Sequence, residues 1–135
     1  MAEVFIVEDN LQHSRRIQQI VLNTGDHRIE TFVDAGQAIA ELKRRIQEHK
    51  YLPDLSVIDL NLPENSGHEI LRFCKQTGAC GDMGILVVSQ RLSEQQASIC
   101  RLMGAGYCIN KSASDEEIES AIRGMLGEGS FQKAS

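Results

Sequence analysis

The chain of 135 residues has no tryptophan, only two prolines, and no apolar run near the roughly 20 residues that a membrane helix needs. It also has no excess of basic residues, because 14 lysines and arginines stand against 19 acids and give a net charge of -5. A negative chain without a basic face argues against direct binding to nucleic acid or to an anionic membrane. No basic segment followed by a long apolar run is visible after Met1, so we expect a cytoplasmic protein.

The four cysteines have neither the spacing of a zinc site nor a C-x-x-C pair. They are Cys74, Cys80, Cys100 and Cys108. We therefore expect reduced, mostly buried thiols, as in proteins of a reducing compartment.

Short apolar runs alternate along the chain with longer stretches of helical period. We predict strands at residues 4–7, 29–32, 55–60, 85–88 and 107–109. The first, third and fourth runs are almost continuously apolar, as strands buried on both faces are, whereas the second and fifth are mixed and suit the edges of a sheet. Apolar residues at i, i+3, i+4 and i+7 predict the intervening helices, and capping patterns mark four helix starts, at Asp34, Ser66, Ser93 and Ser114.

This strict alternation predicts an α/β fold, a doubly wound three-layer (βα)5 sandwich of the flavodoxin-like type with a parallel sheet in the order 2-1-3-4-5. We place this single domain at residues 1–127 and interpret 128–135 as a tail or the start of a linker. In such a sheet, ligands bind beyond the carboxyl ends of the strands, next to the point where the strand order reverses. The residues that follow the strands are therefore the candidate site.

Three carboxylates, a hydroxyl and an ammonium group stand at the ends of strands that this order makes neighbours. They are Glu8, Asp9, Asp59, Ser89 and Lys111. Taken singly, Asp9 could cap the next helix and Glu8 could be a surface acid. Likewise, Ser89 could be a turn residue and Lys111 a charge at a strand end. Asp59 is harder to explain in this way, because it closes an apolar run in which an unpartnered acid is costly to bury.

The chemistry of the cluster points to phosphoryl transfer with a metal ion. Crowded carboxylates repel one another unless a cation lies among them. Mg²⁺ suits the cluster, because it keeps several waters and binds a few carboxylates together with phosphate. An oxygen of Asp59 could then attack a phosphorus centre. Lys111 and Ser89 could neutralise and hydrogen-bond the oxygens of the transferred group.

Four segments resemble the receiver domains of two-component response regulators, and the likeness covers about residues 3–126. The segment VFIVEDN at 4–10 is similar to the first strand of that family with its acidic pair. LSVIDLNLPENSG at 55–67 is similar to the strand and loop that carry the phosphoacceptor. ILVVS at 85–89 matches the strand that ends in Ser or Thr, and Gly104-Ala105 followed by Lys111 matches the approach to the family's lysine.

The resemblance implies that Glu8, Asp9 and Asp59 hold Mg²⁺ together with the backbone carbonyl of Asn61. Asp59 would take a phosphoryl group from a phosphohistidine, supplied by a sensor histidine kinase or a histidine phosphotransferase. The domain would be a signalling switch that catalyses only its own phosphorylation and slow dephosphorylation.

The resemblance also implies that Ser89 and Lys111 respond to the phosphoryl group. Their response would reshape the face formed by the fourth helix, the fifth strand and the fifth helix. That face would bind partners, including a second copy of the chain, and an output domain could follow in a longer protein.

Three positions depart from the family's pattern. Gln90 stands where a small residue is usual, and it could narrow the entrance to the site or contact the phosphoryl group. Cys108 stands where the family usually carries the aromatic residue coupled to activation, and Tyr107 would point to the opposite face, where it could simply pack. Ser112 follows the lysine in place of a proline that often has a cis bond. We expect a trans bond, because a non-prolyl cis bond costs about 2.5 to 4 kcal/mol.

Other readings remain open. A phosphatase of the haloacid dehalogenase type also uses an aspartyl phosphate and Mg²⁺, but it normally carries a second Asp two positions after the nucleophile, where this chain has Asn61. An adaptor could keep the fold for protein binding without phosphorylation. A flavin site is disfavoured, because the loop after the first strand carries acids and lacks a phosphate cradle.

Overall fold

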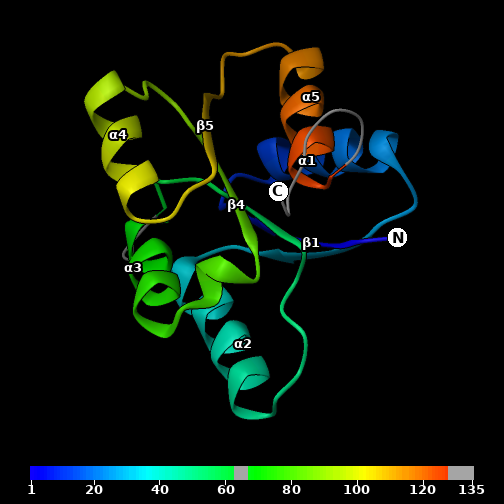
Figure 1. Ribbon diagram of the computed structural model, residues 1–135. Coiled ribbons are helices and arrows are strands. Elements are labelled where there is room, and N and C mark those ends of the chain that lie inside the picture. Colours follow the sequence, from blue (N-terminus) through cyan, green and yellow to red (C-terminus); the bar gives the residue numbers. More distant parts are fainter. Residues whose placement is uncertain (63–66, 128–135) are drawn as a thin grey trace.

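The computed structural model describes residues 1–62 and 67–127 (Figure 1). Strands and helices alternate along these residues as predicted. The elements are β1 Glu3–Val7, α1 Leu11–Thr24, β2 Arg28–Phe32, α2 Ala35–Gln47, β3 Leu55–Ile58, α3 Gly67–Thr77, the short 3-10 helix η1 Ala79–Gly81, β4 Gly84–Ser89, α4 Glu94–Leu102, β5 Tyr107–Asn110 and α5 Asp115–Met125.

The strands form one parallel sheet in the order β2-β1-β3-β4-β5. This confirms the predicted doubly wound flavodoxin-like fold, with the mixed strands β2 and β5 at the two edges. The strand order reverses between β1 and β3, so the loops that follow these two strands open side by side at one end of the sheet.

Successive residues of a central strand face two separate cores. Phe5 and Val7 of β1 belong to a core that also contains apolar residues of α2, α3 and α4. Val4 and Ile6 belong to a second core, which α1 and α5 cover. Figure 1 shows α1 and α5 together on one side of the sheet and α2 and α3 on the other. This three-layer packing covers the two faces of the sheet and leaves the ends of its strands open.

The helix starts follow the predicted capping pattern. The side chains of Asp34, Ser93 and Ser114 accept from backbone N–H groups of α2, α4 and α5. Ser66 and the proposed tail 128–135 lie outside the described residues. Among the described helices, none is both long and apolar enough to cross a bilayer, and the longest, α1, has 14 residues.

The cap of α1 is Asn10, whose side-chain oxygen accepts from the His13 N–H at 3.0 Å. The alternative in which Asp9 caps this helix is therefore wrong. Because the neighbouring amide fills that position, the carboxylate of Asp9 does not serve as the cap of α1.

Strand β3 ends at Ile58, two residues earlier than predicted. The Asp59 N–H still donates to the Val7 carbonyl at 3.1 Å, as in a parallel ladder. One carboxylate oxygen of Asp59 accepts from the Asn61 N–H at 3.0 Å, and such a bond turns the chain. The side chain that ends the strand is thus the predicted phosphoacceptor itself.

Gly67, the first residue of α3, packs directly against this turn. Its N–H donates to the Leu60 carbonyl at 3.1 Å. A Cβ at this position would lie 2.5 Å from the carbonyl oxygen of Asp59, closer than a real Cβ approaches a backbone atom. Glycine therefore allows α3 to start against the end of β3.

We expect Gly67→Ala to lower the free energy of unfolding by about 1 to 3 kcal/mol, because the backbone around Asp59 must shift. Urea denaturation of the purified protein measures this loss. Gly81→Ala is the matched control, because a Cβ there meets no atom within 4 Å. Equal losses in the two variants would contradict the close contact.

Candidate functional site

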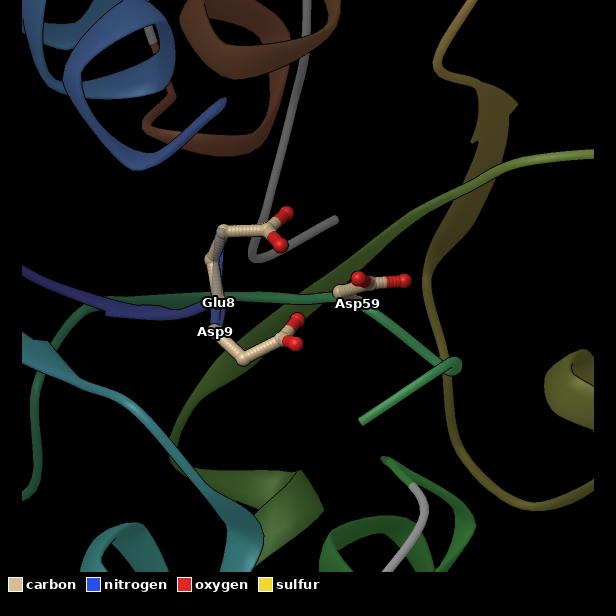
Figure 2. A group of neighbouring side chains, drawn as sticks. All are labelled: Glu8, Asp9 and Asp59. Carbon is tan, nitrogen blue, oxygen red and sulfur yellow. The ribbon is translucent and has the colours of Figure 1, made fainter. Parts of the chain in front are cut away.

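The carboxylates of Glu8, Asp9 and Asp59 converge at the ends of β1 and β3 (Figure 2). One oxygen from each residue lies within 4.8 Å of the oxygens from the other two. Glu8 and Asp59 are buried, whereas Asp9 is exposed. Three carboxylates with one open side suit a hard divalent cation, which prefers oxygen ligands and keeps water on its free positions.

Lys111, directly after β5, brings a positive charge into this cluster. Its ammonium nitrogen lies 2.9 Å from an oxygen of Glu8 and donates to Asp59 Oδ2 at 3.0 Å. A third contact, also 3.0 Å long, joins it to His13 Nδ1. Because an ammonium group only donates, we assign His13 as the neutral tautomer that accepts at Nδ1. The lysine side chain is 11% exposed, so these contacts lie mostly out of water.

The pKa shifts follow from burial and from these charges. Burial raises the pKa of Glu8 to about 7, against the lowering effect of its bonds to Lys111 and the Asn10 N–H, and the charge of Asp59 raises it further. Burial alone would lower the pKa of Lys111, but its bonds to Glu8 and Asp59 outweigh that effect and raise it. The pKa of His13 is lowered by burial and then by the charge of Lys111. A cation among the carboxylates would favour the ionised form of Glu8.

Because the pKa of Glu8 is higher in the folded chain than in the unfolded chain, the chain takes up a proton when it folds. Between the ordinary value of 4.5 and about 7, the carboxyl is protonated in the folded chain and ionised in the unfolded chain. The free energy of unfolding of the metal-free protein should therefore fall as the pH rises through this window, on the order of 2 kcal/mol. Urea denaturation at a series of pH values measures this slope.

Glu8→Gln removes the titrating group, so this part of the pH dependence should disappear in the variant. Glu116→Gln, which changes an exposed acid of α5, should keep it. A wild-type slope that persists in Glu8→Gln would mean that other groups cause it.

Ser89 ends β4 beside the cluster and is 2% exposed. The side-chain amide of Asn61 donates to its hydroxyl oxygen at 3.0 Å, while the backbone N–H of Asn61 donates to Asp59. Asn61 thus links the hydroxyl to the carboxylate from the turn after β3. The sequence suggested a role only for the carbonyl of Asn61, and the bond from its side chain was not predicted.

Gln90 is exposed and lies between two hollows at the edge of the site. A hollow of about 490 Å³ also contacts Asn61 and Ser89. A second, of about 430 Å³, also contacts His13 and Lys111. Gln90 therefore borders both hollows, one beside Ser89 and the other beside Lys111.

Tyr107 and Cys108 point to opposite faces of β5. Half of Tyr107 is exposed, and it borders a groove against α5, so it is not a core residue. The Cys108 thiol lies beneath α4 and contacts the Ala97 carbonyl at 3.8 Å. The bond between Lys111 and Ser112 is trans, as expected.

The structure also brings two residues of α1 to the site that the sequence did not single out. His13 contacts the ammonium group of Lys111, and Arg16 contacts the backbone just after β5. A spacing of three residues along a helix puts both on one face. The sequence shows that this face of the helix is polar. It does not show that the face contacts the segment after β5, which lies about 100 positions away.

Residues 4–123 match the response regulator receiver domain family. The chain belongs to this family. It is thus a receiver domain of two-component signalling, in which such domains are phosphorylated by histidine kinases.

Three proteins illustrate the likeness. The response regulator Rcp1 of Synechocystis sp. is 25% identical over 90% of this chain and 84% of its own. The solved structure of its Mn²⁺-bound form superposes with a TM-score of 0.77 at 24% identity, covering all of this chain and 98% of that one. The phosphorylated cyanobacterial phytochrome response regulator RcpA gives a TM-score of 0.73 at 28% identity over 92% of this chain and 90% of that one.

A third relative is longer than this chain. The virulence transcriptional regulatory protein PhoP of Salmonella typhimurium is 26% identical over 93% of this chain. The match covers 52% of PhoP, so this chain spans about half the length of that regulator.

Proposed function

We propose that this receiver domain takes a phosphoryl group onto Asp59 from a phosphohistidine and loses it slowly to water. The observation that carries the proposal is the buried carboxylate of Asp59, which lies 3.0 Å from the Lys111 ammonium group and within 4.8 Å of the oxygens of Glu8 and Asp9. This geometry combines a carboxylate nucleophile with a fixed positive charge and a set of cation ligands.

The chain's own groups hold Asp59 ready for the transfer. The Asn61 N–H binds Asp59 Oδ1 and Lys111 binds Oδ2, so both oxygens have fixed directions. Attack on phosphorus would form an O–P bond and break the P–N bond of the donor, whose imidazole leaves with the electron pair. Lys111, whose ammonium group binds Asp59 Oδ2, would neutralise the oxygens of the transferred group.

We further propose that Mg²⁺ is the metal, held by Glu8, Asp9, Asp59 and the backbone carbonyl of Asn61. The donor set fits, because it consists of oxygen atoms and includes three carboxyl groups, each with an oxygen within 4.8 Å of the other two. When bound, the ion would supply positive charge to the carboxylates and the phosphoryl oxygens. The Mn²⁺-bound form of Rcp1 supports a divalent cation here.

Ser89 would take part after the transfer. Its hydroxyl now accepts a bond from the Asn61 side chain, and it could donate to a phosphoryl oxygen on Asp59. Movement of the loop after β4 toward the phosphoryl group would displace α4 and alter the face formed by α4, β5 and α5. Exposed apolar side chains on that face support a binding role. They are Ile99, Leu102 and Tyr107.

The proposed partners follow from this switch. A sensor histidine kinase or a histidine phosphotransferase would supply the phosphoryl group in the cytoplasm. The α4-β5-α5 face would bind a downstream partner or a second copy of the chain. The length of PhoP supports an output domain after the receiver in a longer regulator.

A haloacid dehalogenase type of phosphatase is not favoured, because Asn61 stands where that mechanism needs an acid. An adaptor without phosphorylation is not favoured either, because Glu8, Asp9, Asp59, Ser89 and Lys111 all lie in or beside one cluster. Chemical labelling of the domain distinguishes the switch from the adaptor.

Acetyl phosphate with Mg²⁺ should add one phosphoryl group to the wild-type domain, seen as a mass increase of the intact protein. Asp59→Asn should abolish this increase, because an amide nitrogen cannot replace the nucleophilic carboxylate. Asp82→Asn, which changes an exposed acid before β4, should be labelled like the wild type. A phosphoryl group on Asp59→Asn, or none on the wild type, would refute the assignment.

Gln90→Ala should speed labelling by acetyl phosphate on the order of threefold, because a shorter side chain opens both hollows beside the cluster. The rates of labelling and of phosphoryl loss are followed by mass spectrometry over time. Gln47→Ala, at the exposed end of α2, is the control. Unchanged rates in both directions would exclude a modulating role for Gln90.

A further inference from the structure

Arg16, in the second turn of α1, holds the segment that begins with Lys111. Its Nη1 donates to the Lys111 carbonyl at 2.9 Å, and its Nη2 donates to the Ala113 carbonyl at 2.8 Å. Its Nε donates to Asp115 Oδ1 at 2.7 Å. One planar guanidinium group thus contacts two carbonyls of the loop after β5 and a side chain at the start of α5, which a flexible ammonium group could not match.

The same helix contacts the other end of Lys111. His13 lies one turn before Arg16 and contacts the ammonium nitrogen at 3.0 Å. Consequently, α1 touches both the charged group of Lys111 and its backbone carbonyl. The two contacts restrict the lysine at its ammonium group and at its backbone carbonyl.

The segment after Lys111 forms a turn, in which the Ala113 N–H donates to the Asn110 carbonyl at 3.0 Å, and it ends at Ser114, which caps α5. β5 is an edge strand and pairs with β4 alone. The Lys111 N–H donates to the Ser89 carbonyl at 3.0 Å, which fixes the start of the segment. The next residue is Ser112, which lacks the ring that would restrict the backbone of a proline. Arg16 therefore adds a restraint on the Lys111 carbonyl to the bonds of this turn.

We propose that Arg16 is a positioning residue for phosphoryl transfer, which keeps the Lys111 ammonium group against Asp59 by binding the backbone carbonyls of Lys111 and Ala113. Arg16 would not touch the transferred group, and its effect would pass through Lys111. This inference rests on the proposed function of Asp59 and Lys111.

The test compares Arg16→Gln with the wild type in two measurements on the whole chain. Labelling of Asp59 by acetyl phosphate and Mg²⁺, followed by mass spectrometry, should slow on the order of tenfold, because a catalytic group held loosely loses its geometry. The rate at which an amine-acylating reagent modifies Lys111, measured on digested protein, should rise severalfold as the lysine leaves its pocket. A purely structural role elsewhere in the fold would not change the second rate.

Arg123→Gln is the matched control. Arg123 of α5 donates to the Asn23 carbonyl near the end of α1 at 3.0 Å, so it also joins these two helices, but it does so away from Lys111. Both measured rates should stay at the wild-type value in this control. Circular dichroism verifies that each variant folds. If Arg16→Gln does not fold, Arg16→Lys, which keeps the charge and loses the planar fork, replaces it under the same criteria.

An unchanged labelling rate in the Arg16 variant would overturn the proposal. Slower labelling with an unchanged acylation rate of Lys111 would also overturn it, and so would equal changes in Arg123→Gln. Failure of the proposed function looks different, because the wild type itself would then carry no phosphoryl group.

Discussion

Three carboxyl groups meet at one edge of the sheet, and the repulsion among them is the constraint around which the site is arranged. Lys111 offsets part of it, with its ammonium group in contact with both buried acids. The strand order makes this possible, because β5 and β3 flank β4 and a residue after β5 can reach across to Asp59. Burial strengthens these interactions and also raises the pKa of Glu8 to about 7.

In this arrangement the lysine and a metal ion would share the same ligands. Asp59 gives one oxygen to Lys111 and the other to the Asn61 N–H, whereas Asp9 points toward the cluster from the exposed side (Figure 2). The metal-free cluster is therefore already partly neutralised. Removal of Lys111 would leave buried acids without a partner and would lower the free energy of unfolding. The residue proposed to act in phosphoryl transfer therefore also stabilises the fold around the site.

The sequence predicted the sheet and the main site residues, because both depend on local patterns. Apolar runs located the strands, and polar residues after them located the cluster. The sequence placed the end of β3 too late, because the Asn61 N–H binds the carboxylate of Asp59 and turns the chain there. The apolar pattern of residues 55–60 does not indicate this bond. Arg16 was missed for another reason. Arg15 beside it carries the same charge, and only the packing of α1 against α5 decides which of the two meets the loop after β5.

The thiol of Cys108 beneath α4 affects how a signal could cross this molecule. A thiol has no ring to swing between an inward and an outward position. Its contact with the Ala97 carbonyl instead ties the first half of α4 to the edge strand. In the proposed switch, a movement that starts at Ser89 would then shift α4 and β5 together as one unit.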